Sequence, residues 1–287
     1  MSHSHSNHKN TLYVVATPIG NLQDITLRAI DIFKSVDAIA AEDTRHTTHL
    51  LSHFGIQKKL IAVHEHNEHQ SAEILLKRIQ SGESIALVTD AGTPAISDPG
   101  AIVVDVLRQN GVNIVPIPGA SAVIAALSAS GIISNGFSFI GFLPASGSQR
   151  RKVLTSYQAH PVTLVLYEAP HRIVECIVDL ANVLGAERRI TIAREITKTF
   201  ETFHRCLLGE AQAWLESDSN QQRGEFVLMI EPAPVDDSKT LSDESLNTLK
   251  VLLAELPLKQ AVKLAVEITG EKKNLLYDLA LQLKPQN

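Results

Sequence analysis

The segment VTDAGTPAISDPG, which runs from Val88 to Gly100, decides how this chain folds. The apolar run from Ile85 to Val88 predicts a buried strand, and the segment then places two glycines, two prolines and two aspartates within thirteen residues. Glycine frees the backbone and proline fixes it, so a loop rich in both follows a defined path. The loop is longer than a simple connection, and we expect it to hold a ligand.

The same order of strand, loop and helix recurs around this segment. Short apolar runs predict strands at 11–17, 38–43, 59–66, 84–90 and 113–119. Amphipathic runs predict helices between them at 27–35, 48–55, 71–83 and 101–111, the third with Ser71 as its N-cap. Such alternation predicts an α/β fold with a mainly parallel sheet covered on both faces.

The second half of the chain has a different pattern. Predicted strands at 137–144, 162–169, 189–195, 202–209 and 224–232 include successive ones, which favours a mixed, partly antiparallel sheet, with helices at 149–158, 171–184 and 211–216. We therefore predict a disordered leader (1–10), an N-terminal α/β domain (11–121), a second α/β domain (122–232), a linker (233–240) and a helical module (241–287).

Composition limits the class of protein. The chain has 287 residues, of which 44% are hydrophobic and 20% charged, as in ordinary globular proteins. The polar start predicts no secretory signal, and no apolar stretch is long enough to cross a bilayer, so we expect a cytoplasmic protein without a membrane partner. Two cysteines thirty residues apart indicate neither a disulfide framework nor a thiolate metal site. The net charge of -5 argues against a protein that coats polyanions.

Three loops rich in proline and glycine follow predicted strands of the first domain: TPIGNL, TDAGTPAISDPG and IPGAS. In open parallel sheets ligands bind beyond the carboxyl ends of the strands, so these loops should meet at one edge. The chain has neither a GxGxxG nor a GxxxxGK[ST] pattern, which excludes the dinucleotide and P-loop fingerprints.

These loops, together with AEDTR, HEHNE, GFLP and YEAPHR, resemble the tetrapyrrole methylase superfamily, the class III S-adenosylmethionine-dependent methyltransferases. The motifs occur in order from Thr11 to about Pro232. The tetrapyrrole enzymes carry a glycine-rich loop after strand one and GDP after strand four. Here TPIGN and TDA stand instead, as in the branch that methylates ribosomal RNA. The resemblance implies two α/β domains with a cofactor cleft between them.

The resemblance also implies an activity and partners. It implies 2'-O-ribose methylation of a P-site cytidine (the m4Cm site) of 16S rRNA within the 30S subunit, by a homodimer that uses S-adenosylmethionine. One alternative is a superfamily methylase acting on a tetrapyrrole or, as in diphthine synthesis, on a protein side chain. A second alternative is a non-catalytic module that only binds a nucleotide.

Carried onto this sequence, the family's cofactor contacts are Pro18, Val88, Thr89, Asp90, Thr93, Ser121, Ala122, Tyr167, Glu168 and Ile196. A ribose hydroxyl is a poor nucleophile when neutral, so a base should take its proton. The candidates for that base are Glu168, His64, His171 and Glu195. Candidate RNA contacts are Arg45, Arg150, Arg151, Lys152, Arg172, Lys272 and Lys273.

Several of these residues have simpler interpretations. Glu168 and Arg172 would also form an ion pair at a helix cap, and Asp43 and Arg45 would also form a solvated helix start. His64 and His66, two apart on a predicted strand, lack a third ligand, so we predict no metal site.

The last predicted region contains three helices, the first with Ser242 as its N-cap. Their predicted apolar faces consist of Leu246, Leu249, Leu253 and Leu256, then Ala261, Leu264, Ala265 and Ile268, then Leu275, Leu276, Leu279 and Leu283. The last two helices, joined at Gly270, resemble a helix-turn-helix with a modest cationic face that includes Lys259 and Lys263. This module would either dock on RNA or only stabilise the core or the dimer.

Overall fold

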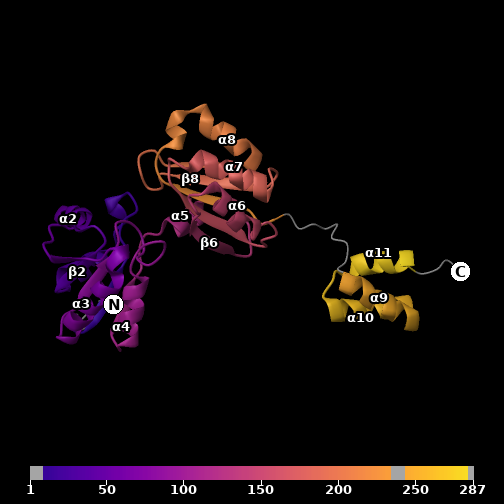
Figure 1. Ribbon diagram of the computed structural model, residues 1–287, viewed down its shortest axis with the longest axis horizontal. Coiled ribbons are helices and arrows are strands. Elements are labelled where there is room, and N and C mark those ends of the chain that lie inside the picture. Colours follow the sequence, from indigo (N-terminus) through magenta and orange to yellow (C-terminus); the bar gives the residue numbers. More distant parts are fainter. Residues whose placement is uncertain (1–8, 234–242, 284–287) are drawn as a thin grey trace. The chain divides into compact units, whose positions relative to one another are not determined.

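A computed structural model describes residues 9–233 and 243–283 of the chain (Figure 1). The chain divides into two compact units, Met1–Ala233 and Pro234–Asn287. Most of the predicted leader and linker, and the predicted N-cap Ser242, lie outside the described residues. Within the described ranges no helix is long and apolar enough to cross a membrane.

The first sheet of the large unit contains five parallel strands in the order β3-β2-β4-β1-β5, which confirms the predicted α/β class. Two helices pack on one face and two on the other, because the strands alternate apolar side chains toward both faces. The strands are β1 (Thr11–Val15), β2 (Ala38–Ala41), β3 (Lys59–Ala62), β4 (Ile85–Val88) and β5 (Asn113–Ile117). The helices are α1 (Leu27–Ser35) and α2 (Thr44–His53) on one face, and α3 (Glu68–Gln80) and α4 (Ala101–Gln109) on the other.

The order of these strands decides where a crevice opens at the edge of the sheet. From β1 the chain crosses toward β2, whereas from β4 it crosses in the opposite direction to β5, and β1 and β4 are neighbours. The loops that follow β1 and β4 therefore separate at their shared carboxyl end. Such a switch point leaves a crevice at the edge of a parallel sheet.

The second sheet has the order β6-β7-β10-β8-β9, with one parallel pair, β6 and β7, and three antiparallel pairs. Helices α6, α7 and α8 cover one face (Figure 1), and α5 packs on the other. The strands are β6 (Phe137–Phe142), β7 (Thr163–Glu168), β8 (Arg189–Arg194), β9 (Thr202–Leu207) and β10 (Phe226–Ile230). The helices are α5 (Ala122–Ala129), α6 (Gly147–Thr155), α7 (Ile173–Leu184) and α8 (Leu208–Ser217), and short 3-10 turns are η1 (Leu22–Asp24), η2 (Glu65–Asn67) and η3 (Ser219–Gln222).

The third strand and the helix after it differ from the prediction. Strand β3 ends at Ala62, and the backbone N–H of His64 donates to Oδ1 of Asn67 at 2.8 Å. This bond folds the segment into the turn η2 and starts α3 at Glu68. Ser71 therefore lies inside the helix, and its prediction as N-cap was wrong. An Asx side chain can replace a backbone turn in this way, which the apolar pattern alone does not reveal.

The small unit consists of α9 (Asp243–Glu255), α10 (Leu258–Thr269) and α11 (Lys273–Leu283). Its core contains Leu249, Val262, Ala265, Leu276 and Ala280. Gly270 ends α10 in the left-handed conformation, as expected for a helix C-terminus.

One predicted face of the small unit needs correction. Leu264 and Ile268 are exposed within the unit, as is Leu283, whereas Val262 is buried. The reason is that the buried stripe of α10 is rotated toward Val262, so that small and branched side chains pack against α9 and α11.

Candidate active site

Backbone and hydroxyl hydrogen bonds join the loops that follow β1, β4 and β5. Thr17 exchanges both backbone hydrogen bonds with Gly92, at 2.8 and 3.1 Å, and its hydroxyl donates to the Thr89 carbonyl at 3.2 Å. The Thr93 hydroxyl donates to the carbonyl of Ala120 at 3.2 Å. The three loops predicted to converge thus form one connected edge of the sheet.

The loop after β2 joins the same edge through carboxylates. Oδ1 of Asp90 accepts the backbone N–H of Asp43 at 3.0 Å, and Oε2 of Glu42 accepts the N–H of Asp90 at 3.4 Å. Two acidic side chains therefore hold the start of α2 against the end of β4.

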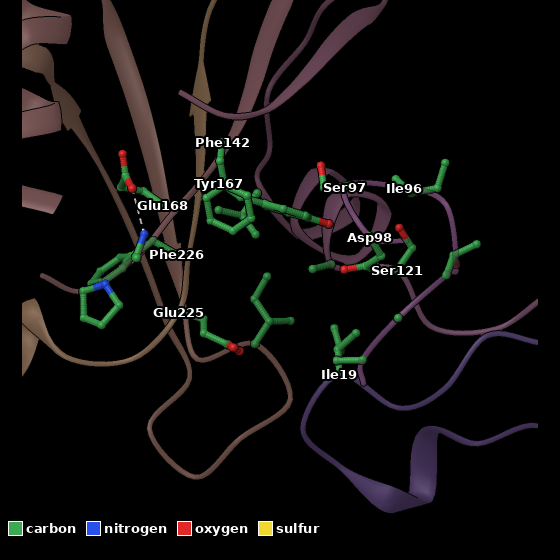
Figure 2. A pocket seen from close by; sticks show the side chains of 18 residues that line it. Ile19, Ile96, Ser97, Asp98, Ser121, Phe142, Tyr167, Glu168, Glu225 and Phe226 are labelled. Carbon is green, nitrogen blue, oxygen red and sulfur yellow. Dashed lines mark hydrogen bonds between the residues drawn. The ribbon is translucent and has the colours of Figure 1, made fainter. Parts of the chain in front are cut away.

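A cavity of about 310 Å³ opens beyond this edge, and both sheets line it (Figure 2). Ile19, Ile96 and Asp98 belong to the side of the first sheet, and Phe142, Tyr167 and Phe226 to the side of the second. This volume falls in the range of small-molecule sites. The two sides approach closely, since a Cβ built at Gly141 would lie 2.6 Å from Oγ of Ser97.

The side contributed by the second sheet is apolar and firmly anchored. Tyr167 contacts Phe139 and Phe142 edge to face, with ring centroids 4.9 and 5.6 Å apart. Below them the buried carboxylate of Glu168 pairs with Arg172 at 3.3 Å. Arg172 also donates to the carbonyls of Leu143 and Pro144 at 2.6 and 3.2 Å. The guanidinium therefore ties the end of β7 to the end of β6.

Two lining loops have strained backbones. Ala95 and Ser97 have φ of 68° and 62°, and Glu195 and Thr197 have φ of 50° and 67°. Residues other than glycine rarely adopt these angles, and such strain concentrates at binding and catalytic sites. Ser97 lines the cavity, and so does Ile196, between the strained residues of the second loop.

The charge of the cavity has one sign. Among the described residues that line it there is no lysine, arginine or histidine, but there are three carboxylic acids, Asp98, Glu168 and Glu225. Burial raises the pKa of Asp98 to about 6, assisted by the negative charges of Glu42 and Asp90 and opposed by the Thr89 hydroxyl. Burial likewise raises the pKa of Tyr167 to about 12. The cavity therefore suits a cation with apolar parts.

The predicted cofactor residues fall into two groups. Thr93, Ser121, Ala122, Tyr167, Glu168 and Ile196 line the cavity. Val88, at the end of β4, and Pro18, Thr89 and Asp90, in the connected loops, are not among the lining residues. Their contacts with a cofactor stay predictions.

The four candidates for the base do not lie together in the structure. His64 and His171 are exposed and do not line the cavity. The carboxylate of Glu195 is occupied by Lys198 at 2.8 Å and by the backbone N–H of Glu225 at 3.0 Å. In the described parts of the chain no group of three His, Cys, Asp or Glu side chains is placed to hold a metal ion. Of the four candidates only Glu168 lines the cavity, and Arg172 pairs with it.

The candidate RNA contacts also separate. Arg45, Arg151 and Lys152 are exposed on the large unit, and Lys272 and Lys273 on the small one. The side chain of Arg150 is only 2% exposed and bonds Oδ2 of Asp179 at 2.6 Å. Arg150 and Arg172 therefore have structural partners, because their neighbours on α7 and β7 supply carboxylates that the local sequence does not reveal.

Asp98 and Phe142 stand out among the lining residues that the sequence did not predict. Asp98 stands inside the segment that first indicated a ligand site, and Phe142 stands in GFLP. The second acid of the loop was an available signal, because an aspartate directly before Pro-Gly at a helix start faces the same edge as Asp90. No local signal distinguished Phe142 from the other phenylalanines of its strand.

Comparisons with known proteins agree with this architecture. The family model for tetrapyrrole (corrin/porphyrin) methylases matches residues 11–212, and that for the RsmI C-terminal HTH domain matches 239–284. Relatives named ribosomal RNA small subunit methyltransferase I are 50% identical in Escherichia coli O157:H7, with 97% of each chain covered, and 52% identical in Pseudomonas aeruginosa, with 95% of this chain and 97% of the relative covered.

Solved structures show the same fold at low identity. A crystal structure of diphthine synthase superposes with a TM-score of 0.60 at 15% identity, covering 77% of this chain and 89% of its own. The chain belongs to the tetrapyrrole methylase family, the S-adenosylmethionine-dependent methyltransferases that its loops resemble.

Proposed function

We propose that this enzyme transfers a methyl group from S-adenosylmethionine to the 2'-hydroxyl of a P-site cytidine of 16S rRNA in the 30S subunit. The observation that carries the proposal is similarity along the whole chain to relatives named ribosomal RNA small subunit methyltransferase I. That similarity includes the C-terminal helices, which match the model of the RsmI C-terminal HTH domain.

The cavity fits the methyl donor. S-adenosylmethionine combines an apolar, aromatic adenosine with a sulfonium and an ammonium, and the cavity combines apolar walls with carboxylates. Ile196 and Val227 provide apolar surface for a flat ring, and the backbone near Thr93 and Ser121 provides polar groups. When bound, the sulfonium supplies an activated methyl group. The residues of the chain then have to align the acceptor oxygen and take one proton.

The acceptor has to enter this cavity without its phosphates. Phosphate needs cationic or N–H partners, and the described lining residues include no cationic side chain. Exposed cations lie elsewhere on the large unit, at Arg45, Arg151 and Lys152. A nucleotide whose sugar projects into the cavity while its phosphates stay outside fits both the lining without cations and the exposed cations elsewhere.

The aromatic side chain of Phe142 provides a surface for the acceptor base. It lines the cavity yet is 55% exposed, and its ring rests edge to face on Tyr167. A base taken out of its stack is commonly held against such a ring. Phe142 would then orient the cytidine while its ribose reaches the methyl group.

We assign the helical unit a role in docking on the subunit. Lys272 and Lys273 are exposed at the start of α11, where cationic side chains suit phosphate contacts. The helix-turn-helix family match supports an interaction with nucleic acid. The enzyme would act in the cytoplasm, where ribosomal subunits are assembled.

A homodimer completes the proposal. The family resemblance suggests it, and large apolar side chains at Ile124, Ile133 and Phe137 are exposed in the monomer, Ile133 by 98%. Exposed apolar residues that gather in one patch mark interaction sites. Light scattering at micromolar concentration should give twice the 31.2 kDa of one chain, and a monomer would contradict this part of the proposal.

The deciding experiment measures methyl transfer from labelled S-adenosylmethionine to 30S subunits that lack the modification. Parallel reactions contain free 16S rRNA, a porphyrinoid and a protein extract. We expect labelling of 30S subunits, mapped by nuclease digestion and mass spectrometry to one cytidine ribose. Labelling only of the porphyrinoid or of a protein would overturn the proposal, and binding of the cofactor without any transfer would favour the non-catalytic alternative.

A further inference from the structure

The three carboxylic acids of the cavity are not equivalent. Glu168 pairs with Arg172 at 3.3 Å, and Glu225 pairs with Lys198 at 2.9 Å. Asp98 makes no ion pair with any residue that the structure describes. It is therefore the acid of the three whose charge no protein cation balances, and it lies where a substrate would be.

The carboxyl group of Asp98 is held in place by its loop. The backbone N–H groups of Gly100 and Ile102 donate to the buried carboxylate of Glu68, at 3.0 and 3.2 Å. The N–H of Ala95 donates to the carbonyl of Pro99 at 3.3 Å, which closes the loop around Ser97. Glu68 thus anchors the start of α4, and the strained segment before it presents Asp98 to the cavity.

The surroundings of Asp98 favour a carboxyl that can hold a proton. Glu42 and Asp90 lie behind it, on the loops after β2 and β4, and the Thr89 hydroxyl lies beside it. Across the cavity stands Tyr167, whose phenol interacts with the charge of Asp98 (Figure 2). Burial and the two neighbouring acids bring the pKa of Asp98 to about 6. A base is most effective when its pKa lies near the working pH.

We propose that Asp98 is the catalytic base, which accepts the proton of the acceptor hydroxyl during methyl transfer. This inference rests on the proposed function, because the proton in question is that of the ribose hydroxyl that accepts the methyl group. The O–H bond breaks and its proton moves to a carboxylate oxygen of Asp98, while the O–CH₃ bond forms and the CH₃–S bond breaks with its electron pair left on sulfur. Charge balances, since a carboxylate and a sulfonium become a neutral acid and a thioether.

The test compares Asp98→Asn with wild type in three measurements. Turnover of 30S subunits at saturating cofactor should fall about a hundredfold or more, the scale of general base catalysis. The Kd for S-adenosylmethionine, from calorimetry without RNA, should change less than about threefold. In the free wild-type enzyme, the ¹³C resonance of the Asp98 carboxyl should titrate near pH 6.

The pH dependence has a defined sign. The base acts as a carboxylate, so kcat/KM of the wild type should fall with unit slope below pH about 6 and stay level above it. Asp98→Asn should lose this inflection. Asp98→Glu should restore part of the turnover with a displaced inflection, and it tests the proposal if the asparagine variant fails to fold.

Two matched controls separate charge from position. Asp105→Asn removes an exposed carboxylate from α4, the helix that follows the Asp98 loop, and should leave every measurement unchanged. Glu225→Gln removes a different carboxylate of the cavity and should leave the inflection intact.

The proposal is overturned if Asp98→Asn keeps its turnover, or if it loses cofactor affinity while kcat stays normal. The second result would make Asp98 a ligand of the cofactor ammonium. Failure of the proposed function is distinct, because wild-type enzyme would then not methylate 30S subunits at all.

Discussion

The two walls of the cavity are built by different means. The wall of the first sheet consists of loops that follow parallel strands, and backbone hydrogen bonds such as those between Thr17 and Gly92 join them. The wall of the second sheet consists of aromatic side chains on strand ends, held by the ion pair of Glu168 and Arg172. The first wall presents backbone groups and Asp98, an acid without an ion pair among the described residues. The second wall presents apolar side chains, and the charges of Glu168 and Arg172 beneath them form an ion pair.

This difference follows from topology. All carboxyl ends of a parallel sheet meet at one edge, so several loops can share one ligand. In the mixed sheet, β10 runs opposite to β6, β7 and β8, so side chains at the start of β10 stand at the same edge as those at the ends of β6 and β7, and together they form the wall. We therefore expect changes in the first wall to affect the cofactor and the chemistry, and changes behind the second wall to affect folding.

The largest effect should come from the network behind the second wall. Arg150→Ala leaves the buried carboxylate of Asp179 without its closest cation, which typically costs about 3–5 kcal/mol of unfolding free energy. Urea denaturation measures this loss. The matched control is Arg151→Ala, which removes an exposed cation from the same carboxylate and should cost less than about 1 kcal/mol. Equal losses of unfolding free energy in the two variants would show that the buried ion pair of Arg150 does not stabilise the fold more than the exposed one of Arg151.

A substitution in the first wall should have a smaller effect, and the effect should be on the affinity for the cofactor. Asp90→Ala removes the acceptor of the Asp43 backbone N–H and a charge beside the cavity, so S-adenosylmethionine should bind more weakly by about 2 kcal/mol, roughly thirtyfold. Calorimetry measures the affinity, and the melting temperature should change little. Asp90→Asn can still accept the N–H and should lose less. Unchanged affinity in both variants would remove Asp90 from the site.

The aromatic wall should affect the acceptor and not the cofactor. Phe142→Ala should raise the KM for 30S subunits about tenfold, since stacking of one base contributes about 1–3 kcal/mol. Phe137→Ala, at an exposed phenylalanine of the same strand outside the cavity, should leave this KM close to that of wild type, and light scattering checks that the variant has the same oligomeric state as wild type. If Phe142→Ala instead weakens cofactor binding, the ring holds the adenine.

Removing the helical unit should have the smallest effect on the affinity for S-adenosylmethionine. A chain ending before Leu241 keeps the compact unit Met1–Ala233 and should bind S-adenosylmethionine normally. Methylation of 30S subunits should decrease, because the phosphate contacts of Lys272 and Lys273 are lost. Normal methylation, or a joint loss of solubility and cofactor binding, would show that these helices do not dock the enzyme.

The sequence alone was sufficient for the architecture. The alternation of apolar runs with amphipathic ones predicted the parallel sheet, and the turn-rich loops predicted which edge would bind a ligand, because both features are local and periodic. The strand after Lys59 was predicted too long because the bond between His64 and Asn67 is a side-chain turn that hydrophobicity does not reveal.

Only the tertiary structure decided which polar residues face the cavity. Arg150 stands in a basic run that suggested RNA binding, yet α6 packs on α7 and directs that side chain to Asp179. His64 follows strand β3 of the first sheet but lies on the surface. Asp98 lines the cavity, although its loop was predicted to bind a ligand mainly through backbone groups. The physical reason is that residue type sets what a side chain can do, but its partners come from segments tens of residues away, and contacts of that range leave no periodic trace in the sequence.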